Sequence, residues 1–250
     1  LAECREKIRD ASHLLLELIN EVLDMGKLES GEIMLEEVPF NLYDIGQNVL
    51  KIIEKMAEER KIEITQDNIG VVHWNLIGSP VHVKRIMMNF ISNAVKYNKE
   101  HGKIMLRCRE ISAEGDTAVF EFTCRDTGIG MSREFQEHLF EPFTQERVVG
   151  YSKYGSTGLG MSITMGLVKR MGGDITFESE KDKGTTFVIT IPFKIDMEKR
   201  EAEKKAKKSV CSIAGLNILL VEDNELNMEI VEFITQNAGA VVTKAWNGRE

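Results

Sequence analysis

Residues 126–130 read Asp-Thr-Gly-Ile-Gly and residues 155–160 read Gly-Ser-Thr-Gly-Leu-Gly. The first stretch follows an alternating segment, Ala118 to Arg125, which has the pattern of a strand, so Asp126 is expected at a strand end. A carboxylate accepts a hydrogen bond from an amino group, and glycines let the backbone come close to a flat ring. The stretch therefore predicts a site for an adenine-like ring, although an isolated Asp-Thr-Gly is also a common turn.

The second stretch stands directly before a segment with a helical pattern, Met161 to Met171. Backbone N–H groups at a helix start, together with the positive end of the helix dipole, favour phosphate. The stretch is not a P-loop, because no Gly-Lys-Ser/Thr follows. It is not a dinucleotide fingerprint either, because Ile163 occupies the place of the third glycine. Taken alone, it could also be a surface loop.

A third feature is a helical segment that begins with Ser79 and Pro80, residues suited to a helix N-cap and first turn. Asn89, Asn93 and Lys96 are spaced to share one face of this helix. An amide oxygen can ligate Mg²⁺, and a lysine one turn away can neutralise phosphate. The face therefore predicts a metal and phosphate site, with a solvent-facing polar stripe as the plainer alternative.

Composition excludes several classes of function. With 42% hydrophobic and 29% charged residues, the 250-residue chain can bury one substantial core. Its net charge of −8 removes the broad basic surface that direct nucleic-acid binding needs. No apolar run reaches the ~18 residues of a membrane span, so we expect no membrane contact within this stretch. The cysteines are scattered without a CxxC pair, which predicts reduced thiols and a cytoplasmic location, although a longer parent could be anchored in the cell membrane.

The order of predicted elements is that of an α+β fold. A long helical pattern runs from Leu1 to Gly31, a short strand is expected at 33–36, and Asn41 caps a helix that reaches Lys61. Further strands are predicted at 62–65, 71–77, 103–109, 118–125, 174–179 and 185–191. This order favours helices on one face of a largely antiparallel sheet.

The last part of the chain has a different pattern. Residues 194–208 are rich in Lys and Glu and predict a charged linker. A strand of buried type at 217–221 then ends in Glu222 and Asp223, and a helix and a strand at 240–245 follow. This pattern predicts the opening of a parallel α/β domain.

Four boxes, in this order, resemble the ATP-binding domain shared by histidine kinases, gyrase, the Hsp90 chaperones and MutL-type repair proteins. They are Asn89 to Asn98, Asp126 to Gly130, Phe140 to Phe143 and Gly155 to Gly160. The resemblance covers approximately Asn41 to Phe193. It implies an ATP-binding α/β sandwich of the histidine-kinase/Hsp90/gyrase type, with ATP and Mg²⁺ as cofactors.

The resemblance also assigns roles to single residues. Asn93 would hold Mg²⁺, and Asn89 and Lys96 would touch the phosphates. Tyr97 would pack on the adenine, and Asp126 would accept from its amino group. The other positions implied for the pocket and its lid are Gly128, Gly130, Phe140, Phe143, Ser156, Thr157, Gly158, Leu159, Gly160 and Thr185.

Position 89 distinguishes between the relatives. Those that hydrolyse ATP resemble one another in having a Glu four residues before the magnesium Asn, where it acts as a general base, and here Asn89 stands in that place. The resemblance therefore implies an enzyme, an ATP-dependent protein histidine kinase of a two-component phosphorelay. The alternatives are a gyrase- or chaperone-like ATPase, a non-catalytic nucleotide sensor and a serine-directed kinase of the anti-sigma type.

Residues 1–38 resemble the second helix and the exit strand of the histidine-kinase dimerisation and phosphoacceptor domain, which implies a homodimer through this helix. His13 departs from the acceptor pattern, because three leucines follow it. The resemblance therefore implies that the accepting histidine precedes Leu1 and that His13 is a residue of the helix surface.

Residues 214–250 resemble the start of a response-regulator receiver, in which Glu222 and Asp223 would help to bind Mg²⁺. The phosphorylated aspartate of that receiver would follow Glu250. A receiver domain or a response regulator is thus the implied partner. The expected division is a dimerisation-helix region at 1–38, a catalytic ATP-binding domain at 39–195, a charged linker at 196–213 and a truncated α/β receiver at 214–250.

Overall fold

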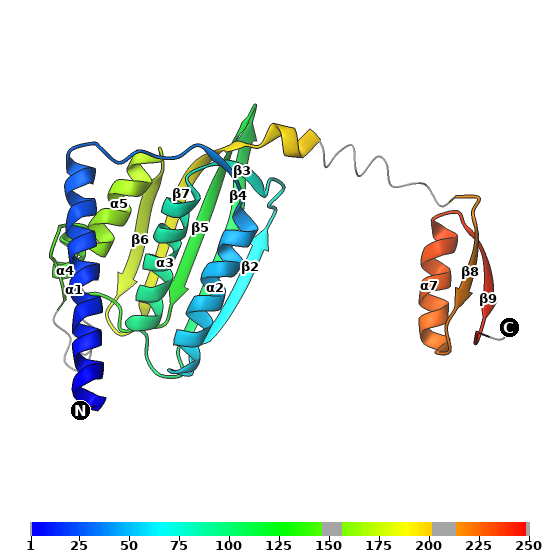
Figure 1. Cartoon of the computed structure of the whole chain (residues 1–250), viewed down its shortest axis with the longest axis horizontal. Helices are drawn as coiled ribbons and strands as arrows, with labels where there is room; N and C mark the ends of the chain where they lie inside the picture. The colour runs from blue at the N-terminus through cyan, green and yellow to red at the C-terminus, as the bar shows by residue number, and fades with distance from the viewer. Residues whose placement is uncertain (1, 147–156, 202–213, 249–250) are drawn as a thin grey trace. The chain divides into compact units, whose positions relative to one another are not determined.

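The computed structural model describes residues 2–146, 157–201 and 214–248 and contains two compact units (Figure 1). The first unit is Leu1–Met197 and the second is Glu198–Glu250. No helix within the described ranges is long and apolar enough to cross a membrane.

The first unit is built on a seven-stranded sheet. The strand order is β1-β3-β7-β5-β4-β2, and β6 pairs with β7. The strands are β1 (Val38–Asn41), β2 (Glu63–Ile69), β3 (Asn75–Gly78), β4 (Lys103–Glu114), β5 (Thr117–Asp126), β6 (Asp174–Glu180) and β7 (Gly184–Ile195). Every pairing in this sheet is antiparallel except β2 with β4. The prediction of a largely antiparallel sheet is therefore confirmed.

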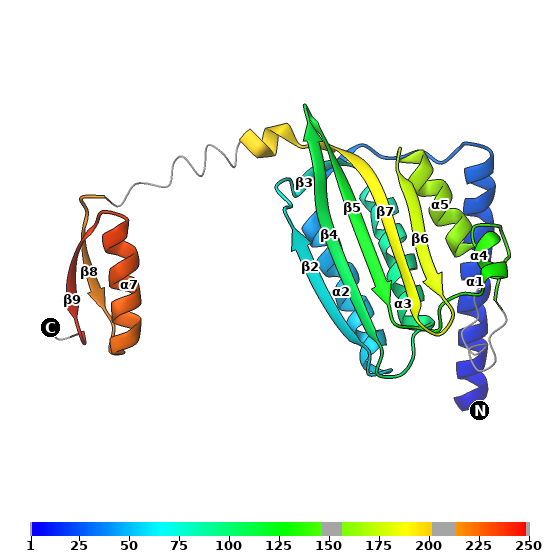
Figure 2. The ribbon, with the colours of Figure 1, turned by 180° about the vertical axis from the view of Figure 1, so that it is seen from behind.

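Helices cover one face of this sheet. The helices of this unit include α1 (Ala2–Glu29), α2 (Leu42–Glu58), α3 (Pro80–Lys96), α4 (Arg133–Glu137) and α5 (Gly160–Arg170), of which α2, α3 and α5 pack on the strands. Viewed from behind, in Figure 2, the strands lie in front and α2, α3 and α5 lie behind them. One buried cluster, with Phe120 and Leu167, lies under α3 and α5, and a second, with Val49 and Ala94, lies under α2 and α3. The predicted arrangement of helices on one face is confirmed.

Helices α2 and α3 begin at the predicted residues, but their N-cap residues, Asn41 and Ser79, differ in their hydrogen bonds. Asn41 accepts a hydrogen bond from the Asp44 N–H through its side chain, at 3.2 Å, as a capping residue does. Ser79 occupies the N-cap of α3 without a side-chain cap bond, because its hydroxyl lies 2.6 Å from Nδ1 of His82. Helix α2 ends at Glu58, earlier than predicted, and Lys61 then turns the chain with a φ of 56°.

The prediction of a strand at 33–36 is wrong. These residues are irregular, and the strand is β1, Val38–Asn41, which pairs with β3. Pro39 stands opposite Ile77 in that pairing. A proline is tolerated there because β1 is at the edge of the sheet, where one side of the strand needs no ladder hydrogen bond.

The end of α1 packs on the rest of the first unit. Met25 and Leu28 join the larger hydrophobic cluster. Leu28 lies so close to Gly166 of α5 that a Cβ at that glycine would come within 2.3 Å of it. Asp24 forms an ion pair with Arg85 of α3. The last turns of α1 are therefore held by both α3 and α5.

The chain that leaves α1 is held as well. Arg170, the last residue of α5, donates to the carbonyl oxygens of Ile33, at 2.9 Å, and Gly31, at 2.5 Å. Ile33 is buried. The irregular segment between α1 and β1 is thus fixed by a side chain from α5.

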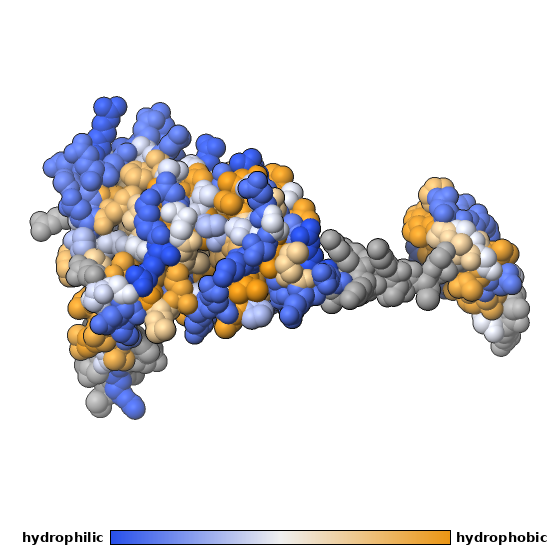
Figure 3. Space-filling model, turned by 90° about the horizontal axis from the view of Figure 1, so that it is seen from above, coloured by the Kyte–Doolittle hydropathy of each residue, from blue (hydrophilic) through white to orange (hydrophobic). Residues whose placement is uncertain are grey.

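The second unit is small. It consists of β8 (Asn217–Val221), α7 (Glu225–Asn237) and β9 (Val241–Ala245), and its two strands pair in parallel. Met228 is fully buried, but Leu219 and Phe233 remain 64% and 67% exposed, and Figure 3 shows hydrophobic residues on the surface of this unit. Its elements match the predicted strand, helix and strand.

Candidate functional site

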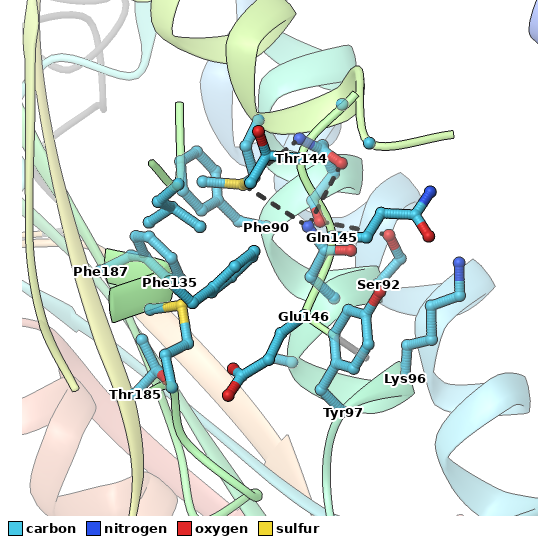
Figure 4. A pocket seen from close by; sticks show the side chains of 18 of the residues that line it. Phe90, Ser92, Lys96, Tyr97, Phe135, Thr144, Gln145, Glu146, Thr185 and Phe187 are labelled. Atoms are coloured by element: carbon cyan, nitrogen blue, oxygen red, sulfur yellow. Dashed lines mark hydrogen bonds between the residues drawn. The ribbon is translucent and has the colours of Figure 1, made fainter. Parts of the chain in front are cut away.

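A cavity of about 240 Å³ lies between α3, the start of α5 and the ends of β5 and β7. Figure 4 shows the rings of Phe90, Phe135 and Phe187 on one side of it and Ser92 and Lys96 on the other. The predicted site residues that line it are Asn89, Asn93, Lys96, Tyr97, Asp126, Gly130, Thr157, Gly158, Gly160 and Thr185. The structure therefore brings ten of the predicted site residues to one cavity, from segments up to a hundred residues apart.

Asp126 stands at the end of β5, as predicted. Its Oδ1 atom accepts hydrogen bonds from the N–H groups of Gly128, at 2.8 Å, and Thr185, at 3.3 Å. Burial raises the pKa of this carboxyl to about 6, and these two N–H groups oppose that rise. No hydrogen bond within the described ranges engages Oδ2, which can therefore accept from a ligand amino group.

The glycines of the Asp-Thr-Gly-Ile-Gly stretch lie in close contact with backbone from other segments. A Cβ on Gly128 would lie 2.3 Å from the carbonyl oxygen of Tyr97, and a Cβ on Gly130 would lie 2.0 Å from that of Glu180. Both positions need glycine because the chain's own backbone passes close by, and the predicted approach to a flat ring stays a prediction. Gly128 is buried and does not line the cavity.

Asn89 and Asn93 form a connected pair on α3. Nδ2 of Asn93 donates to Oδ1 of Asn89 at 3.4 Å, and Nδ2 of Asn89 donates to the hydroxyl of Thr164 at 2.6 Å. Lys96 lies one turn further along the same helix and also lines the cavity. The polar face predicted for this helix therefore points into the cavity and not into solvent.

The residues present fit a Mg²⁺ ion that arrives with a nucleotide. Oδ1 of Asn93 is engaged by no hydrogen bond of the described residues and faces the cavity, and a neutral amide oxygen is a normal Mg²⁺ ligand. In the described part of the chain, no group of three or more His, Cys, Asp and Glu side chains could hold a metal. An ion here would thus depend on phosphate oxygens for most of its ligands.

The start of α5 contributes one hydroxyl and two glycines to the cavity. The hydroxyl of Thr157 accepts from the Leu159 N–H at 3.1 Å. Leu159 itself is fully buried in the core and is not a lining residue, in contrast to its predicted role in binding. Ser156 lies outside the described residues, so its predicted contact stays a prediction.

The two phenylalanines predicted in the lid lie outside the cavity lining. Phe143 is 67% exposed and has a φ of 63°, and its N–H donates to the Gly158 carbonyl at 3.1 Å. The ring of Phe140 packs edge-on against Phe177, with centroids 5.8 Å apart. Phe143 therefore fixes the loop through its backbone, and its ring does not reach the site.

Two acidic residues of the lining were not predicted. Glu21, on α1, receives a hydrogen bond from the Thr157 hydroxyl. Glu146 accepts from the Ser132 N–H at 3.3 Å and pairs with Lys181 at 2.9 Å. Neither glutamate belongs to a motif, and nothing in the local sequence distinguishes them from surface glutamates. Tertiary packing alone brings them to the cavity.

The acidic pair of the second unit stands at the end of β8, as predicted. Glu222 accepts from the Asn224 N–H at 3.2 Å and from Nδ2 of Asn227 at 3.3 Å, while Asp223 is exposed. These bonds hold one acid against the start of α7. A Mg²⁺ site at this position stays a prediction.

A one-sided α/β sandwich with a buried carboxylate opposite an Asn-Asn-Lys helix face defines a nucleotide-binding domain. Residues 78–195 match the family described as histidine kinase-, DNA gyrase B- and HSP90-like ATPase, and they form a domain of that family. The chain is also homologous to sensor histidine kinases. It is 36% identical over 180 residues to the signal transduction histidine-protein kinase BarA of Escherichia coli K12, an alignment that covers 72% of this chain and 20% of BarA.

Two solved structures share the fold. A crystal structure of full-length ShkA in complex with AMPPNP matches with a TM-score of 0.62 and 24% identity, over 96% of this chain and 47% of ShkA. Histidine kinase ThkA, solved in complex with the response regulator protein TrrA, matches with a TM-score of 0.56 and 21% identity, over 74% of this chain and 49% of that chain. The chain spans only 20% to 27% of the length of the curated relatives BarA, LuxQ and GacS that it matches.

Proposed function

We propose that this chain is the kinase core of a hybrid sensor histidine kinase, which binds ATP with Mg²⁺ and transfers the γ-phosphoryl group to a histidine that precedes Leu1. The phosphoryl group then passes to an aspartate of a receiver. The observation that carries the proposal is the cavity wall, where a buried acceptor, Asp126, faces a helix with Asn89, Asn93 and Lys96. Homology to histidine kinases favours this class over the ATPase and sensor alternatives.

The base and the phosphates would be bound at different parts of this wall. Oδ2 of Asp126 accepts from the adenine amino group, and Tyr97, at the end of α3, packs beside the ring. Lys96 and the Thr157 hydroxyl face the phosphates, and Asn93 holds the Mg²⁺ that neutralises them. The residues of the chain thereby position the triphosphate for transfer and compensate its charge.

The transfer itself requires little covalent chemistry from the chain. A bond forms between an imidazole nitrogen of the acceptor and the γ-phosphorus, the bond from that phosphorus to the bridging oxygen breaks, and ADP leaves. Hydrolysis would need a general base for water. Position 89 is an amide, and of the three carboxylates of the lining Asp126 is assigned to the base, while Glu21 and Glu146 already accept hydrogen bonds. The cavity therefore favours a nucleophile brought by another segment over water.

The partners we propose are a second copy of the chain and a receiver. Leu15, Leu16, Ile19, Val22 and Leu23 lie exposed on the described part of α1, an apolar face suited to a helix of a second copy. The parallel β8-α7-β9 unit is typical of a receiver start. The ThkA structure, solved with a response regulator, supports such a partner. A cytoplasmic location stays a prediction that the free buried thiols Cys108 and Cys124 fit.

The test uses the protein with its proposed preceding helix, incubated with γ-labelled ATP and Mg²⁺. We expect protein-bound label that is labile in acid and stable in base, that is lost in Asn93→Ala and that is kept in His13→Ala. The 250-residue chain alone should bind nucleotide and acquire no label. Steady release of phosphate without protein label would contradict the proposal and favour an ATPase. Tight nucleotide binding with neither label nor release would favour a sensor.

A further inference from the structure

The hydroxyl of Thr164 lies between α5 and α3, in a position that nothing in the sequence motifs indicates. The residue is 2% exposed. Its Oγ1 atom donates to the carbonyl oxygen of Gly160, at 2.8 Å, one turn back in α5. A hydroxyl has a single hydrogen to donate, so the second contact of Oγ1, 2.6 Å from the side chain of Asn89, must be one in which Thr164 accepts.

This requirement determines how the Asn89 amide is turned. Since Thr164 accepts, the group of Asn89 that faces it must be the Nδ2 donor, and Oδ1 of Asn89 must point the other way. Oδ1 lies 3.4 Å from the side chain of Asn93 and can only accept, so the Asn93 group facing it is in turn Nδ2. The carbonyl oxygen of Asn93 is thereby directed into the cavity.

The neighbouring residues hold the same orientation. A Cβ on Gly160 would lie 2.7 Å from Oδ1 of Asn89, so only glycine leaves this oxygen its place. The sulfur of Met161 lies 3.8 Å from Nδ2 of Asn89 and 3.6 Å from Nδ2 of Asn93, on the donor side of both amides. A sulfur atom accepts weakly and donates nothing, which again favours the donors on that side.

We infer that Thr164 is a positioning residue, whose hydroxyl acts through Asn89 to present the Oδ1 atom of Asn93 to the Mg²⁺ of the nucleotide. This inference rests on the proposed function, since it concerns the same site. Without the hydroxyl, the Asn89 amide could turn over, and Asn93 would then present either its oxygen or its NH₂ group. An amide NH₂ group has no lone pair to offer Mg²⁺ and turns partly positive hydrogens toward it, so Mg²⁺ affinity would fall while the base pocket around Asp126 would be unaffected.

The experiment compares Thr164→Val, which keeps the shape and removes the hydroxyl, with Thr164→Ser, which keeps the hydroxyl. Binding of a fluorescent ATP analogue is titrated with Mg²⁺ and, separately, measured in EDTA. For Thr164→Val we expect the Mg²⁺ concentration at half-saturation to rise about tenfold, as is usual when a residue that orients a metal ligand is removed. Affinity in EDTA should stay within about twofold, and Thr164→Ser should behave as the unmodified protein. Thr164→Ala serves in place of Thr164→Val if the latter does not fold.

A second readout needs no nucleotide. In the free ¹⁵N-labelled protein, the side-chain NH₂ hydrogens of Asn89 should exchange slowly, and they should exchange faster in Thr164→Val but not in Thr164→Ser. An unchanged Mg²⁺ titration in Thr164→Val, or equal losses in Val and Ser, would overturn the inference. Failure of the unmodified protein to bind nucleotide at all would overturn the proposed function instead, and the exchange measurement would still decide the orientation of Asn89.

Discussion

The hydroxyl of Thr157 donates a hydrogen bond to a carboxylate oxygen of Glu21, which lies 136 positions earlier in the chain. Thr157 belongs to the glycine-rich stretch before α5, and Glu21 belongs to α1. Both residues line the nucleotide cavity. A carboxylate from α1 therefore occupies the hydroxyl that we propose for the triphosphate.

Replacing Glu21 by Gln should tighten nucleotide binding. The substitution removes a negative charge that repels the triphosphate, and we expect Kd for ATP to fall about fivefold, or roughly 1 kcal/mol at this half-buried position. Isothermal titration with ATP and Mg²⁺ would measure it. Glu32→Gln makes the same charge change at an exposed position and serves as the control. Equal affinities for Glu21→Gln and the unmodified protein would show that the carboxylate does not compete with phosphate.

Replacing Asp126 by Asn should weaken ATP binding about 10- to 100-fold. The substitution removes a hydrogen bond and leaves the side-chain NH₂ group facing the adenine amino group, which costs about 1–3 kcal/mol. Oδ1 of the new side chain would keep the N–H groups of Gly128 and Thr185, which places its NH₂ group where adenine presents its own. Unchanged affinity would refute the assignment of Asp126 to the adenine amino group.

The same residue predicts two dependences on pH. Since burial raises the pKa of Asp126 to about 6, protonation below that value replaces an acceptor by a donor, and ATP affinity should fall as the pH drops through 6. The stability of the nucleotide-free protein changes with pH in the opposite direction. A raised carboxyl pKa makes the buried charge cost stability above pH 6, so Asp126→Asn should stabilise the nucleotide-free protein at pH 8, by up to about 3 kcal/mol. Thermal melts at pH 4 and pH 8 would show whether the gain appears only at the higher pH.

Glu110 should be important for stability rather than for binding. It accepts from the N–H groups of Val72 and His73, at 2.8 and 2.9 Å, and from Nδ1 of His73, at 2.7 Å. Burial acts to raise the pKa of Glu110, but these bonds outweigh it and lower the pKa below its ordinary value.

Glu110→Gln should therefore lower the free energy of unfolding by about 2 kcal/mol, because its amide cannot accept all three bonds. The contribution of the carboxylate is present above its ordinary pKa and is lost as the pH falls through the lowered one, so acid unfolding of the variant should begin at a higher pH. Urea melts at pH 7 would measure the first effect. Unchanged stability together with weakened ATP binding would contradict this assignment.

Gly130→Ala should destabilise the fold by more than about 2 kcal/mol, since φ is 59° and the new Cβ would meet the carbonyl oxygen of Glu180 at 2.0 Å. Gly46→Ala is the matched control. Gly46 lies within α2 with nothing within 4 Å of the added carbon, so that change should stabilise by about 0.5–1 kcal/mol. Differential scanning calorimetry of the two variants should give shifts of opposite sign.

Much of the fold could be predicted because its elements carry local patterns. Helix α3 and the β4-β5 pair have long periodic segments and clear end signals, and the structure confirms them. The strand at 33–36 was predicted wrongly because a short strand is defined by its partner. Val38–Asn41 is a strand only because β3, more than thirty residues later, lies beside it.

The candidate site likewise contains residues that the sequence indicates and residues that it does not. Asn89, Asn93 and Asp126 belong to motifs with a regular spacing, so they could be predicted from the sequence. The structure places them around one cavity. Glu21 and Glu146 come from unrelated segments, and only the packing of α1 and of the loop after Phe143 makes them neighbours of the site. A glycine in a sequence indicates that something comes close but not what it is, so the contact of Gly130 with the Glu180 backbone could not be predicted.

The clamp between Arg170 and the residues that follow α1 gives the helix a fixed end. A rotation applied at the other end of α1 would therefore twist the helix along its length. Because the last turns of α1 are held, a rotation of its earlier turns by one residue, about 100°, would have to be taken up before Asp24. Such a rotation would carry Glu21 away from the cavity wall and free the hydroxyl of Thr157. The affinity of the cavity for nucleotide would then depend on the rotation of a helix whose leucines lie exposed.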